Sequence, residues 1–218
     1  MKTTFNLIIA TAILFFATNV LMAQQTEKEL KKEISGKATK KARKEAKKLK
    51  KEGYYVAPGA LPMEKQLEGA WMKQYETTEK GEPKYIVSSG QSVGETQTAA
   101  KLQANETAKL ELAGQINTQV AALIENSIAN QQLNNEEAAS VTKTVAASKN
   151  LIAQELGQVL PLVEIYKKIG QNVEVNVRLA YNAATAFDIA KKVIRKSLEE
   201  ETKIAHEKLE SLMKFDAK

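Results

Sequence analysis

The sequence predicts an α+β fold in which long helices pack on a small antiparallel or mixed sheet, preceded by a basic helix at the N-terminus. Apolar and polar residues alternate from Val173 to Tyr181, as in a strand with one buried and one wet face. Between Ala100 and Val120, alanine and aliphatic residues recur at every fourth position, which indicates a long packed helix. Residues 26–52 consist mainly of lysine, glutamate and alanine, all good helix formers.

Residues 1–23 have the three parts of a secretory signal peptide. Lys2 is the positive start, residues 7–16 are an apolar core, and small or polar residues lead to Ala23. We expect cleavage between Ala23 and Gln24. The alternative is an uncleaved membrane anchor, which the short apolar run disfavours because a spanning helix needs about 20 apolar residues. The protein is therefore expected to be exported to the periplasm, the outer-membrane periphery or the extracellular space.

Cysteine and histidine usage limits the chemistry that the chain can perform. The 218 residues include no cysteine and one histidine. A disulfide framework, a thiol nucleophile and a cysteine-ligated metal are therefore excluded, and a histidine-based metal cluster is disfavoured. The acylated cysteine of a bacterial lipoprotein has no counterpart either. We expect no cofactor.

A basic helical segment is predicted over residues 24–53. Residues 26–53 hold 12 basic and 5 acidic residues, whereas residues 54–218 hold 19 basic and 21 acidic residues. The positive charge of the chain is therefore concentrated in this one segment. Its apolar positions form a narrow stripe at helical spacing, made of Leu30, Ile34, Ala38, Ala42, Ala46 and Leu49.

Two interpretations of the basic helix remain open. It is either a solvated helix that leans lightly on the body, or a cationic surface for anionic lipid, lipopolysaccharide or another envelope polymer. Nucleic acid fits the charge equally well, but it is not expected as a partner of an exported protein. The residues of the predicted cationic surface are Lys37, Lys40, Lys41, Arg43, Lys44, Lys47, Lys48, Lys50 and Lys51.

Residues 54–218 are expected to form a single α+β domain that ends in a charged helix. After a short β-prone run, Pro62 opens a helix predicted over residues 63–75. Trp71 lies on the apolar stripe of this helix. We expect it in the core, and the alternative is a contact for a bound ligand.

A strand is predicted over residues 84–93, with Tyr85, Val87 and Val93 on one face. The glycines at its end match no phosphate-binding fingerprint, so residues 90–94 are interpreted as an irregular strand end.

A long helix is predicted to follow over residues 96–119. Residues 120–131 fit either a helix or a strand, and a strand over residues 123–129 is favoured. Next comes a capped helix over residues 134–155. Its predicted buried residues are Val141, Val145, Ile152 and Leu156.

The sequence of residues 159–215 predicts a β-hairpin followed by a helix. Residues 159–168 and 173–181 are the strands, joined by Gly170, and Pro161 indicates a sheet edge or a bulge. One long helix is expected over residues 183–215. Its first half carries the apolar residues Phe187, Ala190, Ile194 and Leu198, and its highly charged second half is expected to project.

The segment AAKLQANETAKLELAGQI (Ala99 to Ile116), followed by the hairpin VEIYKKIGQNVEVNVRLAY (Val163 to Tyr181), resembles a bacterial envelope family. This is the small membrane-associated family often called the twenty-kilodalton lipoproteins, which is similar to the N-terminal domain of flagellar assembly protein T. The resemblance covers residues 85–198. It implies a compact α+β domain of envelope proteins with no catalytic residues to transfer, and the family's lipid anchor is absent here.

Catalytic groupings are scarce in the sequence. His206 lies in a charged helical segment with no serine elbow nearby, and the paired carboxylates Glu136 and Glu137 lie at a helix start. The chain is therefore expected not to be an enzyme, although hydrolysis by two acidic residues that meet in space stays a third possibility.

The sequence thus favours an exported, non-enzymatic cell-envelope protein that serves as an assembly or interaction module. Its cationic helix would aid envelope association through an envelope protein, an anionic envelope polymer or a peripheral membrane contact. The alternative is a soluble binding protein for a small or polymeric envelope ligand, held between the sheet and Trp71.

Overall fold

A computed structural model describes residue 32 and residues 35–129 and 133–215. The predicted signal peptide and its cleavage site at Ala23 and Gln24 lie outside the described residues. The elements, in chain order, are an N-terminal helix over residues 35–51, then α2 (Met63–Gln74), β1 (Tyr85–Gly94), α3 (Gln97–Ala129), α4 (Asn135–Ala147), α5 (Lys149–Glu155), β2 (Leu160–Ile169), β3 (Asn172–Asn182), α6 (Ala183–Glu201) and α7 (His206–Leu212).

The fold is α+β, as predicted, and its sheet is antiparallel with the strand order β1-β3-β2. Strands β2 and β3 form the predicted hairpin, whose turn uses the positive φ of Gly170. Strand β2 lies at an edge of the sheet and has a register shift between Pro161 and Val163, which confirms both roles considered for the proline. Strand β3 is central because it pairs with β2 on one side and with β1 on the other.

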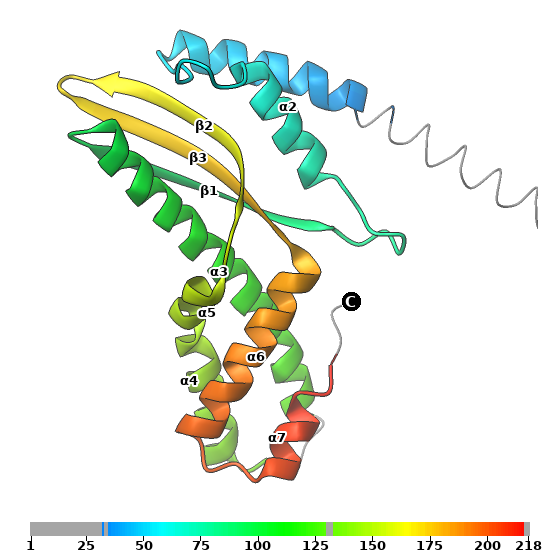
Figure 1. The fold of residues 1–218 in the computed structure, drawn as a ribbon. Helices are drawn as coiled ribbons and strands as arrows, with labels where there is room; N and C mark the ends of the chain where they lie inside the picture. Colours follow the sequence, from blue (N-terminus) through cyan, green and yellow to red (C-terminus); the bar gives the residue numbers. More distant parts are fainter. Residues whose placement is uncertain (1–31, 33–34, 130–132, 216–218) are drawn as a thin grey trace, which may run out of the picture.

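Helix α3 covers one face of the sheet (Figure 1). Its alanines at every fourth position are fully buried, which allows a close approach of helix and strands. On β1, the side that faces α3 carries Ile86, Ser88 and Gly90, and the Ser88 hydroxyl donates to the Ala108 carbonyl at 2.8 Å. Tyr85, Val87 and Val93 share the opposite face, which is less buried.

The interpretation of residues 90–94 as an irregular strand end is wrong. Strand β1 is paired with β3 over its whole length, without a register shift. Gly90 is instead required by packing, because a Cβ atom there would lie 1.9 Å from the Ala104 carbonyl oxygen of α3.

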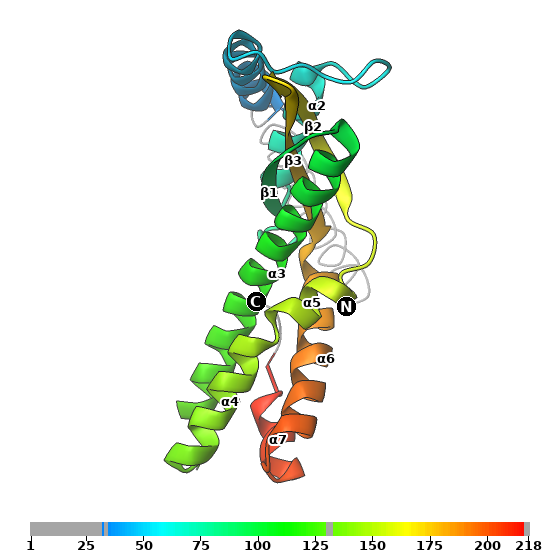
Figure 2. The same ribbon diagram turned by 90° about the vertical axis from the view of Figure 1, so that its left-hand side faces the viewer.

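The strand predicted over residues 123–129 is also wrong, because α3 continues to Ala129. Val120 and Ile124 extend the buried line of α3 by the same four-residue spacing. Beyond the end of the sheet, this part of the helix packs against α4, α6 and α7 (Figure 2). The four-residue spacing therefore outweighs the local β propensity.

The region after α3 forms a helical end to the molecule. The predicted capped helix start is confirmed, and the cap is a capping box, in which the Asn134 side chain accepts from the Glu137 backbone N–H at 2.8 Å. The helix predicted over residues 134–155 is divided at Ser148 into α4 and α5. All four of its predicted core residues, Val141, Val145, Ile152 and Leu156, are buried.

The final helix does not project, contrary to the expectation for its second half. Helix α6 ends at Glu201, and α7 folds back against α3 and α6. Leu209, Leu212 and Met213 are buried there, because their spacing gives α7 an apolar stripe of its own. Phe215 then packs edge-to-face on Phe187, with ring centroids 5.8 Å apart.

The close packing at Gly90 yields a stability prediction. Gly90→Ala would place its Cβ against the backbone of α3, so the helix must separate from the sheet. We expect a loss of roughly 3 kcal/mol or more in the free energy of unfolding, measured by urea titration. The control is Gly69→Ala in α2, where no atom lies within 4 Å. This change should stabilise the protein by about 0.5–1 kcal/mol, and equal effects at the two sites would contradict the packing.

Candidate functional site

The N-terminal helix lies on the face of the sheet opposite α3, together with α2 (Figure 1). Ala38, Ala42 and Ala46 are only 2%, 1% and 0% exposed. The last two belong to a second core with residues of α2 and β2, namely Met63, Leu67, Ala70, Val163 and Ile165. The described part of the helix is therefore packed into the protein through these alanines, and the interpretation as a helix that leans lightly on the body is wrong. Leu30 and Ile34 of the predicted stripe lie outside the described residues.

All nine residues of the predicted cationic surface are exposed, and we call this surface the cationic face. At about 100° per residue, the nine residues and Gly36 fill the outward half of the helix, with no acidic residue among them. From Lys37 to Lys51, the face extends along the helix for about 21 Å. The buried alanine stripe determines this arrangement, because residues not on the stripe must point to solvent.

Some of these cations have partners on the protein itself. Lys50 pairs with Glu64 of α2, and Lys48 lies 3.7 Å from Glu52. The ammonium group of Lys41 lies 4.6 Å from the centre of the Trp71 ring. Within the described part of the chain, no ion pair or hydrogen bond engages the side chains of four other lysines, Lys40, Lys44, Lys47 and Lys51. These four are available to an external partner.

Glu45 is the acidic side chain that fixes the helix to the sheet. Its carboxylate accepts from the guanidinium group of Arg178 on β3 and from the Trp71 indole N–H at 3.0 Å. One side chain thus joins the N-terminal helix, the central strand and α2. The face of β3 that the sequence predicts to be wet is covered here, because its charged residues find partners on the helix and the loop that follows it.

A second polar contact lies just after the helix. The Tyr54 hydroxyl donates to Glu174 of β3, a carboxylate residue only 7% exposed. Burial, together with the hydrogen bond to Glu174, raises the pKa of Tyr54 to about 12. The tyrosine therefore stays protonated and keeps donating across the neutral range.

Two carboxylates of α2, Glu64 and Glu68, contact the N-terminal helix. The Lys50 ammonium lowers the pKa of Glu64, and Lys65 together with the Thr39 hydroxyl lowers the pKa of Glu68. Both acids thus stay ionised to a pH below their ordinary range, and they tie α2 to the basic helix through Lys50 and Thr39.

Trp71, the predicted ligand contact, is half-buried between the helix and Tyr75. Its ring is stacked on Tyr75 with centroids 5.7 Å apart, and Lys41 covers it. The tryptophan is thus engaged by neighbouring residues of the protein.

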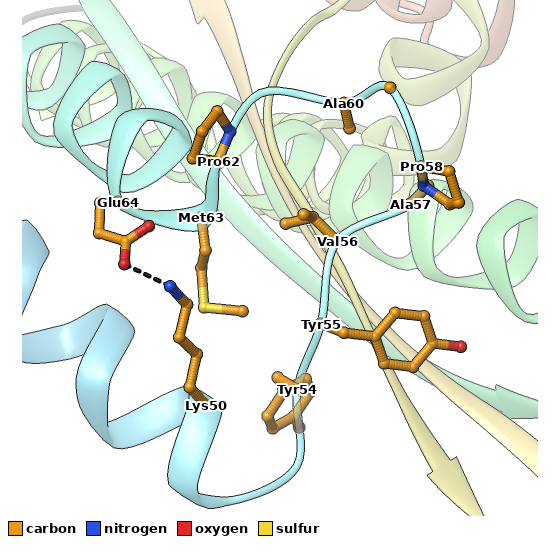
Figure 3. A pocket seen from close by; sticks show the side chains of 11 residues that line it. Lys50, Tyr54, Tyr55, Val56, Ala57, Pro58, Ala60, Pro62, Met63 and Glu64 are labelled. Atoms are coloured by element: carbon orange, nitrogen blue, oxygen red, sulfur yellow. Dashed lines mark hydrogen bonds and ion pairs between the residues drawn. The ribbon is translucent and has the colours of Figure 1, made fainter.

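A hollow of about 570 Å³ lies nearby, under the loop that joins the N-terminal helix to α2 (Figure 3). Tyr54, Tyr55 and Met63 line it, and the Lys50–Glu64 ion pair closes one side (Figure 3). Trp71 does not belong to its lining. The hollow and the tryptophan are thus two separate features.

Two of the residues considered for catalysis, His206 and Glu137, have neighbours with structural roles. His206 is exposed at the start of α7, 3.7 Å from Glu210, and Glu137 caps α4 and pairs with Lys208 at 2.9 Å. In the parts of the chain that the structure describes, no three His, Asp or Glu side chains gather as a metal site would require. No helix in these parts has the length and apolar composition to span a membrane.

Comparisons of the chain with protein-family models, with curated proteins and with solved structures found no match.

Sequence reasoning identifies the cationic residues but misses Glu45 and Arg178. A signal for Glu45 is present, since it is the one acidic residue between Lys37 and Lys51. A single acidic residue in a run of basic residues indicates an ion-pair partner elsewhere in the fold, and not a solvent-exposed side chain. Its partner could not be identified, because Arg178 lies 133 residues further along the chain.

Glu45→Gln tests the link between helix and sheet. The change keeps the shape of the side chain but leaves the Arg178 guanidinium without its counter-charge. We expect a loss of about 1–3 kcal/mol in the free energy of unfolding, followed in urea by the fluorescence of Trp71, the single tryptophan. Glu52→Gln, an exposed acid on the same segment, is the control and should change it by less than about 0.5 kcal/mol. Similar values for both variants would show that Glu45 has no anchoring role.

Proposed function

We propose that this is an exported, non-enzymatic cell-envelope protein whose cationic face binds an anionic envelope surface, while its α+β domain serves as an interaction module. The observation that carries the proposal is the outward half of the N-terminal helix, which holds nine basic side chains and no acidic one. Export rests on the signal-peptide pattern of residues 1–23. Envelope surfaces carry anionic lipids and polymers, so their charge is complementary to this face.

The packing of the helix supports a particular mode of binding. An amphipathic helix that lies in a membrane buries its own apolar face among the acyl chains. Here Ala42, Ala46 and Leu49 of the apolar stripe already pack on α2 and β2, so the described part of the stripe is occupied. The cationic face therefore binds by charge without insertion, and its affinity falls as salt screens the charges.

Membership of the twenty-kilodalton lipoprotein family remains part of the proposal. Its support is the order of a strand, a long alanine-rich helix, two shorter helices, a hairpin and a further helix, from β1 to α6, whereas the second strand of the resemblance is absent. A peripheral contact through the cationic face would serve in place of the family's acylated cysteine, since the 218 residues contain no cysteine.

The alternative, a soluble binding protein with its ligand between the sheet and Trp71, has weaker support. The tryptophan ring is covered by Lys41 and stacked on Tyr75, and its N–H is bound to Glu45. A ligand there would have to displace these contacts.

Neutralising the available lysines is a sharper test than deleting the helix. Deletion would uncover Met63, Leu67 and Ile165, so the domain would lose part of its core. The test variant carries Lys→Gln changes at Lys40, Lys44, Lys47 and Lys51, all exposed. The control carries the same change at four exposed lysines of the helical end, namely Lys143, Lys192, Lys203 and Lys214. Both variants lose the same charge, and both should keep the thermal unfolding of the parent.

The measurement is sedimentation with vesicles that contain phosphatidylglycerol, with neutral phosphatidylcholine vesicles as reference. Each basic residue near an anionic surface contributes about 1 kcal/mol, so the test variant should bind roughly a hundredfold or more weakly. The control variant should bind nearly as the parent does, and added salt should release the parent. Equal losses in the two variants would mean that net charge, and not the cationic face, determines binding.

A further inference from the structure

The loop between the N-terminal helix and α2, residues 53–62, is uncharged and rich in exposed apolar residues, and we call it the apolar loop. Its sequence is GYYVAPGALP. Single exposed apolar residues are common on protein surfaces, whereas a continuous set of them indicates an interaction site. Leu61 is 66% exposed, the highest value among the large apolar side chains of the described residues. The other exposed apolar side chains of the loop are those of Tyr55, Pro58, Ala60 and Pro62.

The backbone of the apolar loop is fixed by hydrogen bonds to the rest of the protein. Its first part exchanges two backbone hydrogen bonds with Tyr166 of β2, at 2.8 and 2.9 Å. Residues 57–60 form a turn, in which Gly59 has a positive φ of 81° and a backbone hydrogen bond of 3.1 Å joins the two ends. The side-chain amide of Gln66 then donates to the Leu61 carbonyl at 2.8 Å. The loop therefore presents its apolar side chains from a defined backbone.

The apolar loop lies beside the cationic face. It begins two residues after Lys51, the last residue of that face. In Figures 1 and 2, the N-terminal helix and the loop lie at the same end of the molecule, opposite α4 and α7. The cationic face points away from the residues of α2 and β2 on which the helix packs. A flat surface against this end of the molecule would therefore meet the cationic face and the loop together.

We propose that the anionic surface bound by the cationic face is a lipid bilayer, and that the apolar loop inserts Leu61 into the boundary between headgroups and acyl chains. This inference rests on the proposed function, since it identifies the surface. A bilayer offers both partners in one plane, because anionic headgroups attract the lysines and the boundary below them accepts apolar and tyrosine side chains. An anionic polysaccharide would attract the same lysines but leave Leu61 in water. The helix itself stays at the headgroups, because its described apolar residues are packed.

Leu61→Gln tests the insertion, and Leu102→Gln is the matched control. Leu102 is 62% exposed on α3, which covers the opposite face of the sheet. Both variants should keep the thermal unfolding of the parent. In sedimentation with phosphatidylglycerol vesicles, Leu61→Gln should bind roughly tenfold more weakly, and Leu102→Gln should bind as the parent does. The ratio between Leu61→Gln and the parent should persist at moderate salt, because salt screens charges and not the transfer of an apolar side chain.

The position of the loop can be measured directly. Because the chain has no cysteine, Leu61→Cys and Leu102→Cys each carry a single environment-sensitive fluorophore. On phosphatidylglycerol vesicles, the label at position 61 should shift its emission to the blue and be quenched by lipids brominated on their acyl chains. The label at position 102 should show neither effect.

The outcomes separate this inference from the proposed function. Vesicle binding that Leu61→Gln leaves unchanged, or a label at position 61 that stays in water, overturns the insertion and leaves the role of the cationic face intact. A parent that binds soluble dextran sulfate but not the vesicles overturns the bilayer as the partner and favours an anionic polymer. Binding to neither probe overturns both the inference and the proposed function.

Discussion

Strand β3 is covered on both of its faces, and this constraint organises the rest of the molecule. Toward α3 it presents Val175, Val177 and Leu179, which belong to the main core. On the opposite face it carries Glu174 and Arg178. Burying these charged side chains costs free energy unless each has a hydrogen-bonding partner. Tyr54 and Glu45 are these partners. The polar face of the central strand thus binds the N-terminal helix through Glu45 and the loop that follows it through Tyr54.

The cationic face is a consequence of this packing. Alanine at Ala38, Ala42 and Ala46 lets the helix approach the protein closely, and a stripe of small residues leaves the outward half to long basic side chains. The charge and the position of the cationic face therefore have one structural origin, the buried alanines.

Local periodicity predicted much of the fold. It placed the packed line of α3, and residue types added the capped helix start at Asn134 and the edge or bulge at Pro161. It failed where the outcome depends on distant residues. Alternation in β3 is the same whether its polar face meets water or partnered side chains, so the sequence could not reveal that Glu45 covers Arg178. The predictions for residues 123–129 and for the end of the chain failed for a related reason. In both places the conformation depends on packing against distant parts of the fold, which local patterns do not show.

Hydrogen exchange of the amides of residues 38–49 tests most directly whether the basic helix is an integral part of the fold. If it is, these amides exchange only when the second core opens, and their protection matches that of α2 and β2, with which they pack. Exchange at the rate of an unstructured peptide, while β3 stays protected, would show a solvated appendage and would contradict the account.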